Sequence, residues 1–285
     1  MPETALSVVI PVYRDAEPLG RLLATLRPAP ERQLIVANGV QDDIELEPLR
    51  RARPDVGWVD GVRGRGAQMN AGAARAVGRW LLFLHADALL SEGWTGTFAE
   101  AEARGASAGC YRLAIDAEGW QPRLIEWGVR LRVRWLGVAY GDQGLFVKRA
   151  RFEMLGGYQE QPLMEDADLV RRLRRTGRFH RAKLPITVSA RRWQRDGWWR
   201  RTGGNLSILL RHLAGQSPQR LAASYPVWSD GRRRCPPIGG QITRETEART
   251  TGVPLTTRVA GGDDGRGLVC AGPRREPVTA RRDKC

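Results

Sequence analysis

The stretch "RWLLFLHAD" (79–87) joins an apolar strand to two chemically active side chains. Trp80 to Leu84 are all apolar, which is typical of a strand covered on both faces. His85 and Asp87 follow at once. Divalent cations such as Mg²⁺ and Mn²⁺ take oxygen ligands and share their shell with substrate phosphates, and Mn²⁺ also tolerates imidazole. The stretch therefore indicates a metal site at a strand end, or else an aspartate that caps the next turn.

Apolar runs and helical segments alternate on both sides of this stretch. Their order, β-α-β-α-β, predicts an α/β fold with a doubly wound, mostly parallel sheet. In such sheets ligands bind beyond the carboxyl ends of the strands, where Asn38, Gly39 and the His85–Asp87 segment would lie. We expect strands at 6–12, 32–39 and 79–87 and helices at 17–28 and 66–78.

The alternation continues to about residue 225, so we place a single functional domain at residues 1–225. Residues 226–285 have no sustained period and are rich in Gly, Pro, Arg and Thr. Such a segment buries too little apolar surface to offset chain entropy, which predicts a disordered tail. A frameshifted reading of GC-rich DNA would look the same, and both interpretations stay open.

Composition restricts the class of protein. No apolar run approaches the roughly 20 residues of a membrane span, and the N-terminus lacks the features of a signal peptide, so we expect a cytoplasmic location. The four cysteines show no metal-binding spacing. The net charge of +15 favours anionic partners such as nucleotide phosphates, nucleic acid or an acidic membrane face. No nucleic-acid-binding motif is visible, so we expect no nucleic acid partner.

The segment "MEDADLVRRLRRTGR" (164–178) places Glu165, Asp166 and Asp168 at the start of an expected helix. Acids at the N-terminus and arginines at the C-terminus suit the helix dipole, which is one interpretation. The other is a general base, because a carboxylate with a tuned pKa can deprotonate a hydroxyl nucleophile.

Two further segments carry groups suited to a sugar or a diphosphate. In "AYGDQGLFVKR" (139–149), Asp142 and Gln143 offer hydrogen bonds to a hydroxyl-rich substrate, although an ordinary turn would look alike. In "SARRWQRDGWWRR" (189–201), Arg191 and Arg192 could hold a diphosphate through forked donors. Trp193 could stack on a ligand or wall the site.

Aromatic and basic residues gather in two apolar segments, "NLSILLRHLAG" (205–215) with the Trp and Arg residues before it, and "WQPRLIEWGVRLRVRWLG" (120–137). Such segments resemble interfacial membrane anchors. A helix packed on the core with its basic residues in water would give the same pattern.

The order of the motifs is more specific than any one of them. The chain from residue 5 to about 225 resembles the family 2 inverting glycosyltransferases with a GT-A fold, a mostly parallel Rossmann-like sheet flanked by helices. It is most similar to a bacterial subgroup in which "LHAD" replaces Asp-x-Asp. The strands "SVVIPVY" and "VANG" and the segments "GRGAQMNAGA", "LLFLHAD", "GDQGLFVKR", "LGGY", "MEDADL" and "ARRW" carry the resemblance.

The resemblance implies a role for each matching residue. Asp166 would be the general base, Asp87 with His85 would bind Mg²⁺ or Mn²⁺, and Asp142, Gln143 and Glu165 would lie near the acceptor or the donor sugar. The expected nucleotide-sugar contacts are Pro11, Tyr13, Arg14, Asn38, Arg65, Asn70, Arg192 and Trp193.

The implied reaction is a single displacement that moves a sugar from a nucleotide-diphosphate sugar, UDP-sugar favoured, to an acceptor hydroxyl. Ala37 and Asn38 replace the residues that the family commonly shows there, which leaves the nucleotide open, and His85 replaces the first acid of Asp-x-Asp. The Trp- and Arg-rich segments predict a lipid or carotenoid-like acceptor and peripheral association with the anionic inner face of the cell membrane. The alternative is a non-catalytic protein that binds a sugar nucleotide or a membrane surface.

Overall fold

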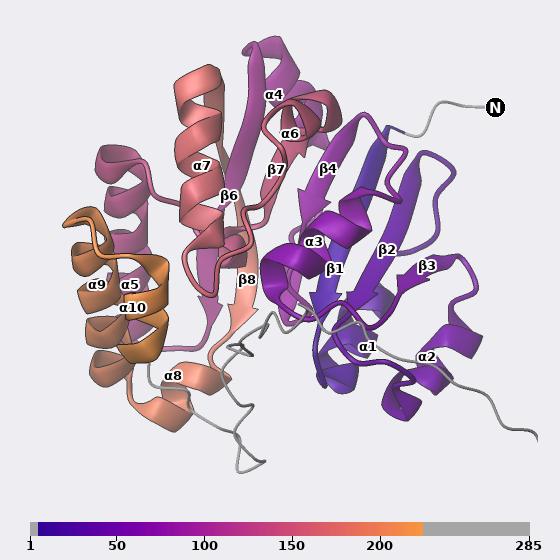
Figure 1. Ribbon diagram of the computed structural model, residues 1–285, viewed down its shortest axis with the longest axis horizontal. Coiled ribbons are helices and arrows are strands. Elements are labelled where there is room, and N and C mark those ends of the chain that lie inside the picture. Colours follow the sequence, from indigo (N-terminus) through magenta and orange to yellow (C-terminus); the bar gives the residue numbers. More distant parts are fainter. Residues whose placement is uncertain (1–4, 225–285) are drawn as a thin grey trace, which may run out of the picture. The chain divides into compact units, whose positions relative to one another are not determined.

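The computed structural model describes residues 5–224, and the predictions for residues 226–285 lie outside this range (Figure 1). The chain forms one eight-stranded sheet with the order β3-β2-β1-β4-β7-β6-β8-β5. The strands are β1 (Leu6–Val12), β2 (Arg32–Asn38), β3 (Val56–Val59), β4 (Trp80–Phe83), β5 (Ala88–Leu90), β6 (Ala106–Asp116), β7 (Leu145–Lys148) and β8 (Arg178–Ser189).

Helices flank this sheet, with short turns between them. The helices are α1 (Ala16–Thr25), α2 (Glu47–Ala52), α3 (Arg65–Ala73), α4 (Gly96–Ala103), α5 (Trp120–Leu131), α6 (Arg149–Met154), α7 (Glu165–Thr176), α8 (Arg191–Asp196), α9 (Trp198–Leu213) and α10 (Pro218–Ser224). The turns are η1 (Ile44–Leu46), η2 (Arg132–Leu136, a π-helical turn) and η3 (Gly141–Gln143).

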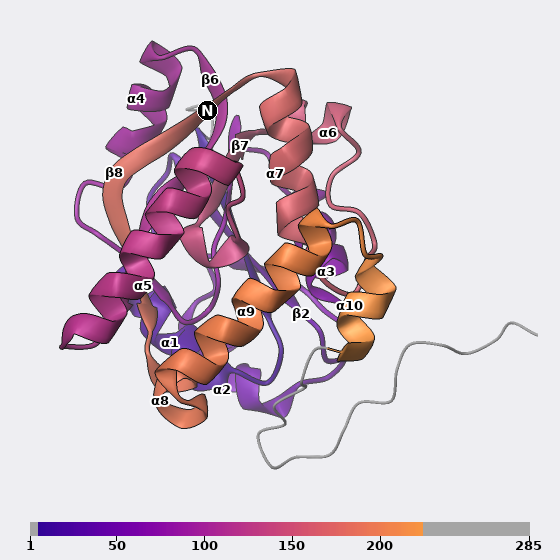
Figure 2. The same ribbon diagram turned by 90° about the vertical axis from the view of Figure 1, so that its left-hand side faces the viewer.

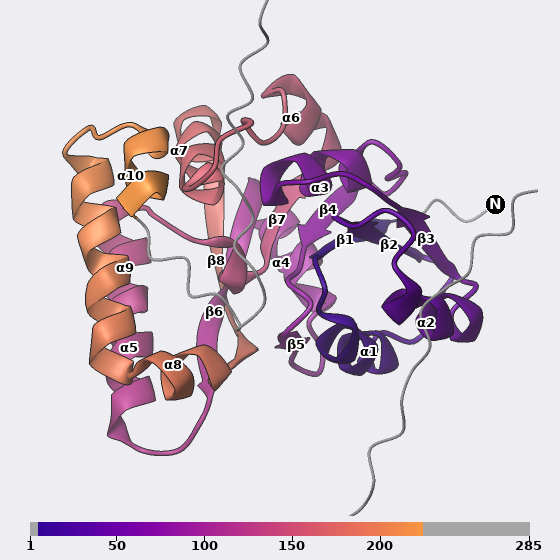
Figure 3. The same cartoon turned by 60° about the horizontal axis from the view of Figure 1, so that its bottom comes forward.

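The strand directions confirm the predicted α/β class. β3, β2, β1 and β4 run parallel, β7 is antiparallel to both β4 and β6, and β8 is parallel to β6 and antiparallel to β5. The sheet is therefore mixed but mostly parallel, as in a GT-A fold. α1 and α3 cover opposite faces of the β1–β2 region (Figure 3).

The apolar run of β4 is divided between the two faces of the sheet. Trp80, Leu82 and Leu84 belong to one core cluster, and Leu81 and Phe83 belong to the other. Since successive side chains of a strand point to opposite faces, a strand covered on both sides needs apolar residues throughout. Packing on both faces holds β4 in place and so positions the segment that follows it, which contains His85 and Asp87.

One predicted strand needs correction, and one strand of the sheet was not predicted. The strand expected at 79–87 ends at Phe83, because its partner β7 starts opposite that residue and is preceded by Gly144 in the left-handed region. His85 then begins a turn, since its carbonyl accepts a hydrogen bond from the Ala88 amide at 3.1 Å, and the chain continues as β5. The hydrophobic pattern did not predict β3, because only Val56 of its four residues is buried.

In the described residues, 5–224, no helix is long and apolar enough to cross a membrane. α5 and α9 lie side by side at one end of the sheet (Figure 2).

Gly109 on β6 provides a test of this packing. A Cβ there would overlap the Phe146 ring and the His180 carbonyl oxygen, so we expect Gly109→Ala to lower the free energy of unfolding by about 1–3 kcal/mol. Gly203→Ala on α9 is the matched control, because nothing lies within 4 Å of its added Cβ, and it should raise stability by about 0.5–1 kcal/mol. Urea unfolding measures both, and equal stabilities would contradict the packing at β6.

Candidate active site

A cavity of about 150 Å³ brings together residues from several parts of the chain. Its lining includes His85 after β4, Tyr140 and Asp142 at η3, Asp166 on α7 and Arg192 on α8, along with the first residue of α3. The sequence analysis placed His85, Asp142, Asp166 and Arg192 in a common site, and the structure gathers these four around one cavity.

Arg65, the first residue of α3, joins the two acids that begin α7. Its Nε donates to Glu165 Oε1 at 2.5 Å, and its Nη2 donates to Asp166 Oδ2. Both carboxylates are almost fully buried. Burial alone would lower the pKa of Arg65, but Asp166 and Glu165 outweigh it and raise that pKa above its usual range. Arg65 is therefore a permanent cation against the two acids.

Asp166 has one held oxygen and one unpartnered oxygen. Its Oδ2 also accepts from the backbone amide of Gly141 at 3.0 Å, whereas its Oδ1 is buried without a hydrogen-bond partner. Burial raises the pKa of Asp166 to about 6, although Arg65 opposes that rise. A carboxylate with this pKa is mostly ionised at neutral pH and still binds a proton readily, which suits a general base.

Gly141 lies between Asp166 and His85. A Cβ there would lie 2.8 Å from Asp166 Oδ2 and 2.8 Å from His85 Nε2, so no other residue fits without displacing both. The glycine of the "GDQG" turn thus allows the backbone of η3 to separate these two side chains.

Two further polar atoms at the cavity lack partners, His85 Nε2 and Asp142 Oδ1, and both are buried. Burial lowers the pKa of His85 well below its usual value, and Arg65 and Arg192 add to the effect, so the imidazole is neutral. Burial also raises the pKa of Asp142. Buried polar atoms normally find a partner, so these atoms are candidates for contact with a bound molecule.

Asp87 lies beside two arginines of α8. Its Oδ2 is 3.7 Å from Arg191 Nη2 and 3.9 Å from Arg192 Nη2. Arg191 also donates to both oxygens of Asp15, at 3.2 and 3.3 Å, which ties α8 to the chain after β1. These contacts bring cations to Asp87, in the turn between β4 and β5.

Among residues 5–224 no group of three or more His, Cys, Asp or Glu residues could hold a metal ion by itself. The buried His85 Nε2 lacks a protein partner and lines the Asp166 cavity, whereas Asp87 lines a separate hollow with Pro18 of α1. Their joint role as ligands of a divalent ion therefore stays a prediction.

The expected nucleotide contacts near β1 and β2 lie outside the small cavity. Tyr13 is exposed, and Arg14, which has a left-handed backbone, places its guanidinium 5.5 Å from the Tyr13 ring centroid. Pro11 is partly exposed on β1. Asn38 is fully buried, and its amide donates to the Val40 carbonyl at 2.7 Å. Their roles toward a nucleotide stay predictions.

Three other predicted residues pack against the rest of the fold. Asn70 exchanges two hydrogen bonds with the Tyr158 backbone, at 2.8 and 2.9 Å. Gln143 is buried and accepts from Arg132 at 3.1 Å. Trp193 is buried, stacks against Trp198 and lines a larger apolar cavity. Their ligand contacts, and that of Glu165, also stay predictions.

Sequence reasoning missed Arg132, Tyr140 and Asn205. The Arg132 guanidinium lies 3.9 Å from the Tyr140 ring centroid, and it acts to lower the pKa of Asp142. Asn205 on α9 lines the cavity with Asp166. Arg132 and Asn205 belong to segments whose sequence shows only an amphipathic pattern. No local signal in the sequence shows which residues of these segments line a cavity.

The sequence was compared with protein-family models and with curated protein sequences. Residues 7–147, just under half of the chain, match the family model of Glycosyl transferase family 2. No curated protein sequence matches the chain significantly.

Several solved structures share the fold at low sequence identity. S. aureus TarS 1-349 has a TM-score of 0.51 and 14% identity, over 76% of this chain and 68% of that one. Its complex with UDP-GlcNAc has a TM-score of 0.50 and 15% identity, over 65% and 58%. The mannosyltransferase PcManGT from Pyrobaculum calidifontis, in complex with GDP-Man and Mn²⁺, has a TM-score of 0.54 and 17% identity, over 76% and 67%.

The match to the Glycosyl transferase family 2 model covers residues 7–147, and the solved structures show a shared fold.

The raised pKa of Asp166 predicts a particular pH dependence of stability. Because the folded protein binds this proton more tightly than the unfolded chain, the contribution is present at low pH and is lost as pH rises through about 6. Asp166→Asn removes this titration, so its stability relative to the wild type should rise between pH 4 and pH 7, by up to about 3 kcal/mol. Urea unfolding across this range measures the difference, and parallel pH profiles would contradict the raised pKa.

Proposed function

We propose that the protein is an inverting glycosyltransferase of the hexosyltransferase type, which moves a sugar from a nucleotide-diphosphate sugar to an acceptor hydroxyl. One observation carries the proposal. Asp166 is a buried carboxylate with one oxygen held by Arg65 and Gly141, a second oxygen without a partner, and a pKa of about 6. A carboxylate in this state can accept a proton from a hydroxyl group, as a general base does.

The donor is proposed to lie across the carboxyl ends of β1, β2 and β4, where ligands of parallel sheets bind. Arg191 and Arg192 stand at this edge and suit a diphosphate. We favour a UDP-sugar, and the residues at the end of β1 and at Asn38 would contact the nucleoside. The fold is shared with proteins crystallised with UDP-GlcNAc and with GDP-Man, which agrees with a nucleotide-sugar donor.

Mg²⁺ or Mn²⁺, when bound, would supply positive charge that stabilises the departing nucleoside diphosphate. Asp87 and His85 would hold it. His85 is suited to this because its imidazole is neutral and its Nε2 has no protein partner.

In the proposed reaction Asp166 takes the proton of the acceptor hydroxyl through its unpartnered oxygen. The acceptor oxygen forms a bond to the anomeric carbon while the bond to the diphosphate oxygen breaks, which inverts the configuration. Arg191 and Arg192 stabilise the negative charge that develops on the leaving group. Arg65 keeps Asp166 from becoming fully protonated and holds it in place.

The rival interpretation is a non-catalytic protein that binds a sugar nucleotide. It would need the donor site without a working base. A binding protein would not require a buried carboxylate with a raised pKa and an unpartnered oxygen. These properties of Asp166 therefore favour the enzyme.

Binding and hydrolysis of UDP-, GDP- and dTDP-sugars, with and without Mn²⁺, test the proposal. We expect one donor to bind in the presence of metal. Asp87→Ala should weaken that binding at least tenfold, whereas Asp166→Asn should retain binding and lose at least a hundredfold in turnover, the lower range for loss of a general base. Titration calorimetry and product analysis separate the two effects. If no donor binds under any condition, the transferase proposal fails.

We also propose peripheral association with the anionic inner face of the cell membrane. α5 and the adjoining η2 expose Trp120, Trp127 and Trp135, of which Trp135 is 74% exposed. Exposed arginines at 123, 130 and 134 accompany them. Aromatic side chains with nearby cations are suited to an anionic lipid surface.

Sedimentation with liposomes of anionic lipid tests this association. The wild type should bind at low salt and release at high salt, because exposed charges are screened. Trp127→Ser should weaken binding severalfold. Ile44→Ser is the matched control, since Ile44 is also an exposed apolar residue but lies at η1, and it should bind like the wild type. Equal binding of the two variants, or no binding at low salt, would contradict the membrane proposal.

A further inference from the structure

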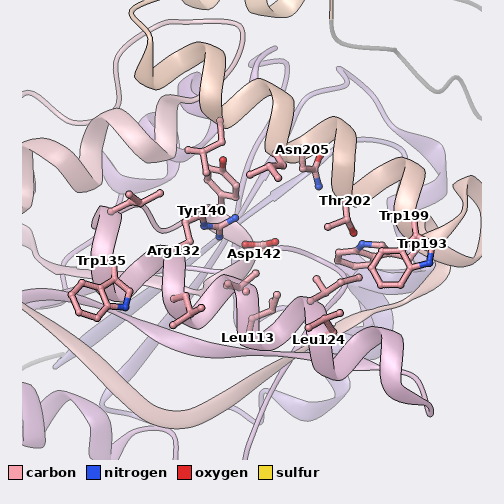
Figure 4. A pocket seen from close by; sticks show the side chains of 17 residues that line it. Leu113, Leu124, Arg132, Trp135, Tyr140, Asp142, Trp193, Trp199, Thr202 and Asn205 are labelled. Carbon is pink, nitrogen blue, oxygen red and sulfur yellow. The ribbon is translucent and has the colours of Figure 1, made fainter.

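A second, larger cavity of about 400 Å³ lies between α5 with η2 on one side and α9 on the other (Figure 4). We call it the α5–α9 pocket. Leu124 and Ile125 come from α5, Trp135 and Leu136 from η2, and Leu206 and Leu209 from α9. Its volume falls in the range of about 300–1,000 Å³ that is usual for ligand sites.

The pocket adjoins the cavity that contains Asp166. Tyr140, Asp142 and Asn205 line both. Figure 4 shows Tyr140, Arg132 and Asp142 grouped in the middle of the view, with apolar side chains around them. A molecule in the pocket would therefore have an apolar environment along its length and polar groups at the boundary with the Asp166 cavity.

The pocket is open, so it is more than a packing defect of the core. Leu206, Leu136 and Trp135 line it and are still 52%, 53% and 74% exposed. Apolar surface that stays in contact with water is unfavourable, and contiguous apolar surface of this kind commonly marks a binding site.

The pocket also contains polar atoms that the fold leaves unpaired. Besides Asp142 Oδ1, the indole Nε1 of Trp193 and the hydroxyl of Thr202 are buried without a hydrogen-bond partner. Both residues belong to the lining. Because buried polar groups are normally satisfied, these atoms favour an occupant that carries oxygen as well as carbon.

We propose that the α5–α9 pocket binds the apolar chain of the sugar acceptor, an alcohol with a long alkyl or isoprenoid chain. The chain packs among the leucines and tryptophans, and its hydroxyl reaches the boundary at Tyr140 and Asp142, next to Asp166. The inference rests on the proposed function for the identity of the occupant as an acceptor. The binding of the chain itself depends only on the pocket.

Fluorescence quenching tests the pocket without requiring turnover. Trp135, Trp193 and Trp199 line it, so a brominated alcohol such as 12-bromododecan-1-ol should quench tryptophan fluorescence on binding. We expect saturable quenching in the full-length wild type, reversed by farnesol but not by 3-methyl-2-buten-1-ol, which has the same hydroxyl and almost no chain. Each buried methylene should strengthen binding by about fourfold.

A pair of variants on α9 locates the binding. Leu206 and Leu210 are 52% and 56% exposed, but only Leu206 lines the pocket. Leu206→Gln should weaken binding of the bromoalcohol at least fivefold, whereas Leu210→Gln should change it less than twofold. Both residues are half exposed, so both variants should fold, and thermal unfolding checks this. Equal weakening by the two variants would place the probe on the outer apolar surface and overturn the proposal.

The donor assays separate this inference from the proposed function. Saturable quenching that depends on Leu206, together with transfer of sugar to farnesol by the wild type, supports both. The same quenching in a protein that binds no sugar nucleotide would sustain the pocket as a site for apolar alcohols and refute the transferase. No saturable quenching would refute the pocket, whatever the donor assays find.

Discussion

The ion pairs of Arg65 with Glu165 and Asp166 are the interaction on which the site depends. They join the first residue of α3 to the first turn of α7, although the residues are about a hundred positions apart in the chain. Two carboxylates this deeply buried need a nearby cation, because burial and the charge of Glu165 both raise the pKa of Asp166. Breaking such a group by removing one partner is strongly destabilising, because it leaves charges buried without compensation. The arginine therefore stabilises the junction of the two helices and also lowers the proton affinity that burial gives to Asp166.

The small cavity keeps several buried polar atoms unpaired around this charged group. His85 Nε2, Asp142 Oδ1 and Asp166 Oδ1 all lack partners, and the Gly141 backbone keeps His85 and Asp166 apart. Unpaired buried polar atoms cost free energy of folding, which the apolar packing of β4 on both faces of the sheet offsets. The rigid strand thus supports a turn whose own side chains are not fully satisfied. The unpaired atoms of this turn could form hydrogen bonds with a ligand.

α5 and α9 combine two properties that the sequence presented as alternatives. Ile125 and Leu209 are buried against the rest of the fold, as expected of helices packed on a core. Trp127 and Leu210 on the same helices are exposed, as expected of an interfacial surface. The two interpretations are therefore not exclusive, because a helix has more than one face. Between the helices lies the α5–α9 pocket, which no periodicity analysis could have identified, since its walls come from segments some seventy residues apart.

The sequence by itself determined the α/β class, the strands expected at 6–12 and 32–39 and the helix of the "MEDADL" segment, because hydrophobic periodicity is a local property. It also named Asp142, Asp166 and Arg192 as members of a common site. Only the tertiary structure decided that Arg65 pairs with the two acids, that β4 stops at Phe83, that Asn205 lines the Asp166 cavity and that Arg132 lies over the Tyr140 ring. These features arise from contacts between distant segments, whose geometry depends on how the sheet curls and how the helices cross, and no local pattern encodes that.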